Sequence, residues 1–458
     1  MNTPMRLSSY TIPVKINDNQ DKYIIVHGYT GAIDVINKDL YNYISKSTNL
    51  LDENSPYTKD IIEKLQRRGY LTHRTAQEEI EYVRNAAQVL HKKHYRSRKS
   101  FVLVVTYDCN FQCPYCFEEE FFNTINHRKT ISRRMVDNFY NSIQFLEPDQ
   151  KLRNRQISLF GGEPLLKENK QIIDYIVRKG NEYGFSFTAT SNGYDIDHYE
   201  ELLGANLIEG IQVTIDGTRN VHDSRRIHSV KKISYDQIIK NIFLALNKDI
   251  AIRVRMNVDE NNYNEVHKLN NEFTELGLFK YKNFSVYSAF ISGSINFSPE
   301  AYTDNKKPLT QKKFIELFKD SNLKIQNNVS LHERINSAIT QNKPITLIPY
   351  HCNSHTNSYV FDPYGNIYSC LEVIGDKHKA IGTYNGTIKW KKEKEVWHTR
   401  NITSVNKCLK CRYAFLCGGG CFAKVISSGK QIDSYCDGFP IVFQNTMDDI
   451  FAQKNKSY

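Results

Sequence analysis

The sequence predicts an α/β protein built around an open, partial (β/α)6 TIM barrel, with smaller domains before and after it. Strand-like and helix-like segments alternate through residues 96–300, the first part of the chain follows a different order, and ten cysteines gather in two places. A chain of 458 residues is long enough for two or three packed units. We expect an N-terminal α+β domain with a linker helix (1–95), the barrel (96–300), a bridging region (301–345) and a cysteine-rich domain (346–458).

The N-terminal region opens with three short β-type runs, bounded by Asp, Asn and Gly turns, and continues with two amphipathic helical patterns. In order, these segments are residues 10–16, 22–28, 32–37, 38–46 and 57–69. A charged helix over residues 75–94 leads from them to the barrel. The pattern predicts a small three-stranded sheet backed by helices.

Six strand candidates alternate with helical patterns in the second region, which is typical of a parallel sheet. The strands are expected at residues 101–106, 156–160, 185–191, 210–215, 251–258 and 283–288, with helices for example at 135–146, 170–180 and 235–247. In barrels of this kind, chemistry gathers where loops leave the C-terminal ends of the strands.

The formal charge of +11 does not indicate a nucleic-acid partner, because the basic residues are scattered along the chain. No stretch approaches the roughly 18 apolar residues that a membrane span needs. The first 16 residues lack the basic start and apolar core of a signal peptide. We therefore expect a cytoplasmic protein with no membrane partner. In that reducing compartment its cysteines are metal ligands more often than disulfides.

Cys109, Cys113 and Cys116 follow the first barrel strand directly, with three and then two residues between them. Three thiolates on one short loop can hold three irons of a [4Fe–4S] cube and leave the fourth iron open. Zinc is the alternative, although no fourth ligand stands nearby. The loop resembles the hallmark of the radical S-adenosylmethionine (radical SAM) superfamily. The resemblance implies that S-adenosylmethionine binds the open iron and is cleaved to a 5′-deoxyadenosyl radical, with Tyr115 near the adenine or, alternatively, only packed within the loop.

Later strand ends resemble the cofactor-binding positions of the same superfamily. Gly161, Gly162 and Glu163 end the second strand and are similar to the motif that binds the methionine part, where Glu163 would accept from the ammonium group. By the same resemblance we expect cofactor contacts at Ser191, Asn192, Thr214, Asp216 and Arg226, although Asp216 with Gly217 is also a good turn. His222, Asp223, Arg255 and Asn257 are weaker candidates, and no catalytic acid or base is identified among Glu118, Glu119, Glu120 and Tyr287.

Seven more cysteines lie near the C-terminus, and their order resembles the SPASM domain of radical SAM enzymes that modify peptides and proteins. A zinc ribbon would explain only four of them. The resemblance implies two auxiliary [4Fe–4S] clusters, and three clusters in all. The first would use Cys352, Cys370 and Cys421, and the second Cys408, Cys411, Cys417 and Cys436. The first therefore lacks one cysteine, so its last iron would take either a substrate thiolate or a local ligand such as His351, His355 or Asp362.

The N-terminal segments resemble the RiPP recognition element, a winged-helix-like fold that binds the leader of a ribosomal precursor peptide by strand addition. An inert cap on the barrel is the alternative. We expect a peptide maturase that forms a thioether or carbon–carbon cross-link, served by an electron donor such as flavodoxin or ferredoxin. A sulfatase maturase that makes formylglycine is a second hypothesis, against which Leu371 stands where those enzymes carry an acidic residue. A non-enzymatic iron–sulfur scaffold is the third, and it would have no use for Glu163.

Overall fold

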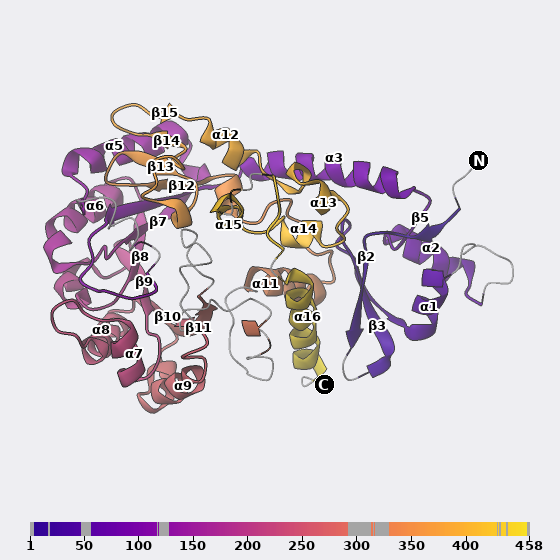
Figure 1. Ribbon diagram of the computed structural model, residues 1–458, viewed down its shortest axis with the longest axis horizontal. Coiled ribbons are helices and arrows are strands. Elements are labelled where there is room, and N and C mark those ends of the chain that lie inside the picture. Colours follow the sequence, from indigo (N-terminus) through magenta and orange to yellow (C-terminus); the bar gives the residue numbers. More distant parts are fainter. Residues whose placement is uncertain are drawn as a thin grey trace. The chain divides into compact units, whose positions relative to one another are not determined.

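The computed structural model describes residues 4–16, 19–46, 56–116, 118, 128–291, 313–314, 316, 329–427, 429, 432–436 and 438–455. Contacts group the chain into two units (Figure 1). The terminal unit comprises Met1–Arg96, Asn327–His355 and Arg400–Tyr458, and the barrel unit comprises Ser97–Gln326 and Thr356–Thr399. The expected division into four domains stays a prediction, and these contacts divide the cysteine-rich region between the two units.

The barrel unit contains one large sheet with the order β11-β10-β9-β8-β7-β6-β12-β13-β14-β15. Its strands are β6 (Lys99–Thr106), β7 (Arg153–Gly161), β8 (Ser186–Ser191), β9 (Ile208–Thr214), β10 (Ala251–Val258), β11 (Phe284–Phe290), β12 (Ser358–Phe361), β13 (Asn366–Tyr368), β14 (Gly382–Thr383) and β15 (Lys389–Trp390). Strands β6 to β11 pair in parallel, one after another, which confirms the α/β fold with a large parallel sheet. Strand β12 extends the sheet in parallel beside β6.

Helices on the outside of this sheet follow the predicted pattern (Figure 1). They are α5 (Arg133–Leu146), η1 (Gln150–Leu152), η2 (Lys167–Asn169), α6 (Lys170–Glu182), η3 (Ile196–Leu202), α7 (Arg219–Arg225), α8 (Tyr235–Asn247), α9 (Glu265–Glu275), η4 (Leu278–Lys280), η9 (Leu371–Val373) and α12 (Glu393–His398). Helix α5 illustrates why they form: Ser132 caps its first turn by accepting from Met135 N, and Val136, Phe139 and Ile143 bury one face.

The terminal unit begins with the expected strands and helices. The antiparallel strands β2 (Thr11–Ile16), β3 (Asn19–His27) and β4 (Ile33–Asn37) are followed by α1 (Lys38–Lys46), α2 (Lys59–Arg67) and α3 (Ala76–Tyr95), and short β1 (Arg6–Leu7) pairs with β5 (Leu71–Thr72). Ile25, Ile44 and Ile62 belong to one buried core, so α1 and α2 pack on the sheet. Strand β4 is an edge strand, because it pairs only with β3 in the described residues.

The C-terminal part of the terminal unit shares a core with its first strands. It consists of α11 (Val329–Thr340), η8 (Asn353–His355), η10 (Ile402–Ser404), α13 (Asn406–Leu409), α14 (Ala414–Cys417), α15 (Phe422–Ser427) and α16 (Phe439–Asn455). Tyr10, Tyr29 and Val83 are buried in the same cluster as Leu409 and Phe415. Nothing in the sequence pattern predicts this joint core between the two ends of the chain. Across the described residues, no helix combines the length and the apolar character that crossing a membrane requires.

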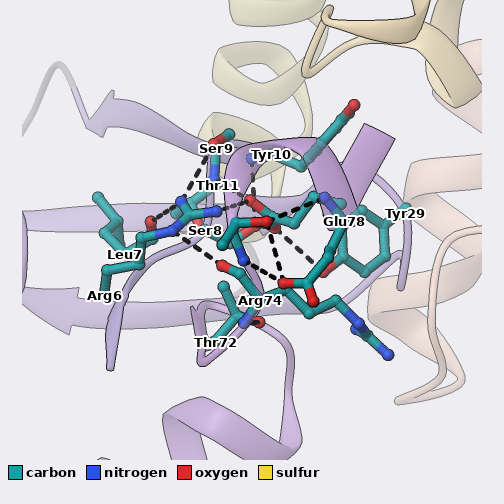
Figure 2. A network of polar contacts seen from close by, with 12 residues as sticks. Arg6, Leu7, Ser8, Ser9, Tyr10, Thr11, Tyr29, Thr72, Arg74 and Glu78 are labelled. Carbon is teal, nitrogen blue, oxygen red and sulfur yellow. Dashed lines mark hydrogen bonds and ion pairs between the residues drawn. The ribbon is translucent and has the colours of Figure 1, made fainter. Parts of the chain in front are cut away.

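A buried carboxylate fixes helix α3 to the strands of this unit. The Glu79 side chain is fully buried and accepts hydrogen bonds from the Ser8 hydroxyl, Ser9 N (3.1 Å) and Tyr29 OH (3.1 Å), and Arg6 Nη2 lies 2.6 Å away. Figure 2 shows Arg6, Ser8, Ser9 and Tyr29 converging on one place. Burial alone would raise the pKa of Glu79, but these hydrogen bonds hold it below its usual value.

His27 belongs to the same network and is buried without charge. Its Nε2 lies 3.0 Å from the Ser8 hydroxyl oxygen, and its Nδ1 accepts from Thr30 N at 3.2 Å. Because Nδ1 is an acceptor, Nε2 carries the proton and donates to Ser8. Burial lowers the pKa of His27 to about 4, and the negative charge of Glu79 opposes this only in part.

We predict that the terminal unit loses stability between pH 7 and pH 5 through His27. Its folded pKa of about 4 lies below its unfolded value, so its contribution is complete above about pH 6.5 and is lost as pH falls toward 4. The expected loss from pH 7 to pH 5 is about 2 kcal/mol. Hydrogen exchange of β2 and β3 amides measures it, and the variant His27→Gln should show a much smaller change. Equal losses in both proteins would contradict the prediction.

Candidate functional site

The cysteine loop leaves the C-terminal end of β6, as the sequence predicts. Cys109 N donates to Asp108 Oδ1 (2.9 Å), Phe111 N donates to Cys109 Sγ (3.4 Å), and Cys116 N donates to Cys113 O (3.0 Å). The bond from Cys116 N closes a turn over Cys113–Cys116, and the bond from Phe111 N turns the chain around the Cys109 sulfur. An N–H group that donates to sulfur stabilises negative charge there, which a cluster-bound thiolate requires.

The three thiols lie within electrostatic reach of one another. Burial raises the pKa of Cys109 well above its usual value, and the charges of Glu163, Cys113 and Cys116 raise it further. Burial and then Glu118 raise the pKa of Cys116 to about 12. In the described part of the chain, no group of three or more Cys, His, Asp or Glu side chains has the arrangement of a metal-ion site. The donor chemistry nevertheless fits an iron–sulfur cluster, because cationic iron would relieve the repulsion between thiolates.

Gly161 and Gly162 end β7, where the chain passes against the cysteine loop. A Cβ atom on Gly161, whose φ is 147°, would lie 2.1 Å from Thr106 O, and one on Gly162 would lie 2.4 Å from Asp108 O. Gly162 N donates to Thr106 O (3.0 Å) and Glu163 N donates to Asp108 O (2.7 Å). The two glycines therefore permit close approach to the backbone of the cysteine loop, whereas the sequence predicts close approach to a ligand.

Glu163 joins the ends of two neighbouring strands. Its side chain is buried, and its Oε1 accepts from Leu165 N (2.8 Å) and from the Ser191 hydroxyl (2.9 Å), while its Oε2 accepts from Asn192 N (2.5 Å). Burial raises the pKa of Glu163 to about 7, and these three bonds oppose the rise. Asn192 Nδ2 also donates to Asn110 Oδ1 of the cysteine loop (2.7 Å). The structure thus brings Glu163, Ser191 and Asn192 together beside the cysteines.

Tyr115 and Asp216 meet in a second polar group at the ends of β9 and β10. The Tyr115 hydroxyl donates to Asp216 Oδ2 and accepts from Arg226 Nη1 (2.9 Å), and Asn257 N donates to Asp216 Oδ1 (3.0 Å). Thr214 is buried at the end of β9. Tyr115 is therefore a hydrogen-bonded loop residue here, and a place beside the adenine stays a prediction.

Arg226 is a buried cation with donor capacity to spare. Its Nε is buried and has no hydrogen-bond partner in the described part of the chain. Burial would lower its pKa, but the charges of Cys113, Tyr115 and Asp216 raise it well above its usual value. An orphaned guanidinium nitrogen of this kind fits a ligand carboxylate.

The weaker candidates support the site or stay without a role. His222 Nδ1 accepts from Asp216 N (3.4 Å), and Asp223 accepts from Ser234 N (2.8 Å) at the start of α8. Arg255 Nε donates to Asn257 Oδ1 (2.8 Å), and Tyr287 OH donates to Gln212 (2.6 Å). Glu119 and Glu120 lie outside the described residues.

Glu118 stands out among the possible acid or base groups. It is buried beside the cysteine loop, and its Oε1 has no hydrogen-bond partner in the part of the chain that the structure describes. Burial and then the charge of Glu163 raise its pKa to about 8. No motif in the sequence marks Asn110 and Asp195, which join the cysteine loop to the residues after β8: Asn110 Nδ2 donates to Asp195 Oδ2 at 3.1 Å, and Asn110 Oδ1 accepts from Asn192. The position of Asn110 inside the cysteine loop is the one sequence feature that indicates a role for it at the site.

Four C-terminal cysteines share one electrostatic environment within the terminal unit. Burial raises the pKa of Cys417 to about 12, and the charges of Cys408, Cys436 and Cys411 contribute. Cys411 N donates to Cys408 O (3.0 Å), which repeats the turn between Cys113 and Cys116. This set fits the second auxiliary cluster in its chemistry, because cationic iron would relieve the repulsion between thiolates that lie this close together.

The cysteines of the expected first auxiliary cluster fall in different units. Cys352 and Cys421 belong to the terminal unit and Cys370 to the barrel unit. Among the proposed substitute ligands, Asp362 is fully engaged: its carboxylate accepts from Asn366 N (2.7 Å), Tyr364 N (3.0 Å), and the hydroxyls of Tyr107 and Tyr368 (3.3 Å each). Its role is to close the turn between β12 and β13.

His351 and His355 are the other two proposed ligands. His351 Nδ1 lies 3.4 Å from Cys417 O, and the buried His355 ring packs against Phe422 with its own carbonyl 3.0 Å from His91 Nε2. That His351 or His355 binds a cluster remains a prediction.

Comparison with known proteins identifies the class. Residues 103–271 match the Radical SAM superfamily, and they span β6 to α9 with the cysteine loop and both polar groups described above. Residues 103–271 therefore form a radical SAM domain and the chain is an enzyme, which argues against the non-enzymatic scaffold. Radical SAM chemistry implies S-adenosylmethionine and one [4Fe–4S] cluster.

Among known relatives, the chain is similar to maturases. It is 23% identical to a cysteine-type anaerobic sulfatase-maturating enzyme of Clostridium novyi, over 77% of this chain and 96% of that protein. It is also 23% identical to the antilisterial bacteriocin subtilosin biosynthesis protein AlbA of Bacillus subtilis, over 71% of this chain and 67% of that one.

Two solved structures share the fold. Native anSMEcpe with bound AdoMet and Cp18Cys peptide aligns with a TM-score of 0.58 at 15% identity, covering 79% of this chain and 99% of that chain. Streptococcus suis SuiB bound to precursor peptide SuiA aligns with a TM-score of 0.52 at 14% identity, covering 94% of this chain and 98% of that chain. At such identities these likenesses establish the fold alone.

We predict that Gly162→Ala disturbs the cysteine loop, because the added Cβ would lie 2.4 Å from Asp108 O. The variant should lose about four irons on reconstitution and cleave S-adenosylmethionine about tenfold to a hundredfold more slowly. Gly210→Ala is the matched control, since its Cβ meets no atom closer than 3.4 Å. Full iron content in Gly162→Ala would show that the loop tolerates the shift.

Proposed function

We propose that this chain is a peptide maturase that cross-links residues of a ribosomally synthesised precursor peptide through a thioether or carbon–carbon bond. The observation that carries the proposal is the combination of a radical SAM site with an N-terminal sheet whose edge strand β4 is open in the described residues. The first supplies radical chemistry, and the second supplies a surface on which an extended leader can add a strand.

The residues of the barrel unit divide the work of holding the cofactor. Cys109, Cys113 and Cys116 would hold the cluster, Glu163 would accept from the ammonium group, and Arg226 would donate to the carboxylate. When bound, S-adenosylmethionine and the reduced cluster supply a 5′-deoxyadenosyl radical, which removes a hydrogen atom from the peptide. The hydrogen bonds from Ser191 and Asn192 favour the ionised form of Glu163 and oppose the rise in its pKa, and burial keeps water away from Glu163 and Arg226.

The C-terminal cysteines would hold two auxiliary clusters. Cys408, Cys411, Cys417 and Cys436, which belong to one unit, fit the second. Cys352, Cys370 and Cys421 stay a prediction for the first. Since Asp362 is engaged by four donors in the barrel unit, it is a poor fourth ligand. An open iron would suit a substrate thiolate, and this supports thioether formation over a carbon–carbon bond.

A leader peptide would dock on β4. Val35 of β4 is 50% exposed, whereas the next residue, Ile36, is buried, so the strand presents one apolar side chain to solvent at the edge of the sheet. The fold of anSMEcpe leaves about a fifth of this chain uncovered, a share close in size to the residues before β6, whereas the fold of SuiB covers 94%. The extra segment supports a leader-guided enzyme.

The second candidate function is the oxidation of a cysteine or serine in a sulfatase to formylglycine. The Clostridium novyi relative, aligned over 96% of its length, favours it. Leu371 stands against it, because the position expected to carry an acidic residue is apolar, and the neighbouring Glu372 is exposed. Incubation with a candidate precursor peptide and a sulfatase peptide, followed by mass spectrometry, separates the two functions. Loss of two hydrogens with all sulfur retained and no aldehyde indicates a cross-link, and an aldehyde indicates formylglycine.

We predict that the triple variant Cys109→Ala, Cys113→Ala, Cys116→Ala abolishes cleavage of S-adenosylmethionine but keeps about eight irons on the two auxiliary clusters. The physical reason is that these thiols would hold only the cluster of the barrel unit. Iron and sulfide analysis with an assay of 5′-deoxyadenosine measures both properties. Retained cleavage would remove the assignment of the reactive site.

We also predict that Val35→Glu weakens the modification of a leader-bearing precursor. A charge on the apolar edge should raise KM about five- to thirtyfold, while cleavage of S-adenosylmethionine without peptide stays unchanged. Val89→Glu on α3 is the matched control, because Val89 is 69% exposed in the same unit. This point change is preferable to removing residues 1–95, which would strip Tyr10 and Val83 from the core around Cys408. An unchanged KM would remove the docking role of β4.

A further inference from the structure

A second loop is paired with the cysteine loop along its backbone. Ser229 N donates to Asn110 O (2.8 Å), Gln112 N donates to Ile227 O (2.8 Å), and Phe111 and His228 form an antiparallel bridge between them. The segment lies between α7 and α8, and Ser234 at its far end is buried and bonded to Asp223. We call Ile227–Ser234 the paired loop.

The outer side of the paired loop combines apolar and basic side chains. Val230 is 76% exposed and Ile233 is 65% exposed, and Lys231 and Lys232 lie exposed between them. Neither lysine makes an ion pair with any residue that the structure describes. Two uncompensated charges flanked by exposed aliphatic groups are typical of a surface that meets an acidic protein partner.

His228 holds this surface in a defined shape. Its Nδ1 accepts from Val230 N and Lys231 N (3.1 Å each), and Lys232 N donates to His228 O (3.0 Å). Lys232 adopts a left-handed conformation, with φ of 64°, which turns the chain sharply. The side chains therefore project from a folded turn, and little ordering is needed when a partner binds.

Further positive charge lies near the turn, and the nearby carboxylates of Asp195 and Glu168 are engaged in hydrogen bonds or an ion pair. Lys231, Lys232 and Lys167 all act on the charge of His228, so they lie near it. Asp195 also acts on it, but its buried carboxylate accepts from Asn110 and from Lys167 N. The carboxylate of Glu168 is paired with Lys167 Nζ, at 3.8 Å.

The same turn is close to the cluster ligands. The His228 ring lies 4.4 Å from the ring of Tyr194 and 5.6 Å from that of Phe111, centroid to centroid. Phe111 N in turn donates to Cys109 Sγ. A protein bound on the paired loop would therefore be connected to the sulfur of Cys109 through two residues that contact each other, His228 and Phe111.

We propose that the paired loop, through Val230, Lys231, Lys232 and Ile233, is the docking surface for a small acidic protein that delivers single electrons, such as flavodoxin. This inference rests on the proposed function, since it assumes a cluster on the cysteine loop. In the step it serves, one electron leaves the reduced carrier of the donor and reduces the cluster by one electron. No bond is broken and no proton is transferred.

Charge and size favour this occupant over others. The turn offers few cations, whereas nucleic-acid binding needs a longer row of phosphate contacts. A leader peptide has the open strand β4 in the other unit. A small acidic donor needs only a limited contact, because weak electron-transfer complexes have small interfaces that are steered by charge.

The test reverses the two charges with Lys231→Glu, Lys232→Glu in the reconstituted full-length enzyme. An acidic flavodoxin, reduced by its reductase and NADPH, is the donor, and dithionite is the chemical reductant that needs no docking. We expect cleavage of S-adenosylmethionine supported by flavodoxin to fall about tenfold at low salt, and cleavage supported by dithionite to stay within about twofold. The affinity for oxidised flavodoxin, measured by biolayer interferometry, should fall by a similar factor.

The matched control is Lys280→Glu, Lys282→Glu. Both lysines are exposed, they follow the exposed Phe279, and they precede β11, whereas the cysteine loop follows the C-terminal end of its strand. This change has the same net charge and should leave the flavodoxin-supported rate within about twofold. A second variant, Val230→Ser, Ile233→Ser, should weaken affinity while the dependence on salt stays the same.

Each contrary result removes the proposal. Equal loss with both reductants would show that the paired loop serves the cofactor site, and equal loss in the control would show a general charge effect. Unchanged flavodoxin affinity, or binding of a DNA oligonucleotide or precursor peptide in place of flavodoxin, would place the donor elsewhere. If dithionite supports no cleavage in the unaltered enzyme, the proposed function fails, and the affinity comparison still decides the docking surface.

Discussion

The joint core of the terminal unit is the constraint on which most of the architecture depends. Tyr10, Tyr29 and Val83 from the start of the chain are buried with Leu409 and Phe415 from near its end. Gly28 approaches so closely that a Cβ there would lie 2.1 Å from Arg412 O. The N-terminal sheet and the four-cysteine segment therefore form one packed unit, and iron binding in that segment would stabilise the surface proposed for the leader.

In the barrel unit, two glycines and two buried carboxylates hold the ends of neighbouring strands together. Gly161 and Gly162 let β7 approach the cysteine loop, and Glu163 then reaches across to the end of β8. Asp216 does the same between β9 and β10 through Asn257. The carboxylates of Glu163 and Asp216 therefore accept hydrogen bonds from backbone and hydroxyl donors before any cofactor binds. Such a site is preorganised, and little reorganisation is needed when a charged ligand arrives.

The sequence allowed the barrel and the positions at its strand ends to be predicted, because periodicity and motifs are local signals. The ranges 101–106, 156–160 and 251–258 correspond to β6, β7 and β10. What local patterns could not reveal is long-range packing. Neither the pairing of β12 with β6 nor the joint core has a periodic signature, since both join residues that are hundreds of positions apart.

The same difference between local signals and long-range packing applies to individual side chains. Glu163 and Ser191 were predicted at one site because a motif marks them, and the structure brings them together. Asp362 is a candidate cluster ligand by residue type alone, but two backbone amides and two tyrosine hydroxyls donate hydrogen bonds to its carboxylate. The hydrogen-bond partners of a buried carboxylate come from distant strands, so they cannot be predicted from the local sequence.

The pairing of β12 with β6 has a consequence for synthesis of the protein on the ribosome. Strand β6 carries the cysteine loop, and one of its two neighbours, β12, is translated about 250 residues later. Until then, β6 is an edge strand of the nascent sheet and exposes unpaired amides and apolar side chains. Completion of the sheet around the cysteine loop therefore has to wait until β12 has been synthesised, and slow translation would prolong exposure of the strand that anchors this loop.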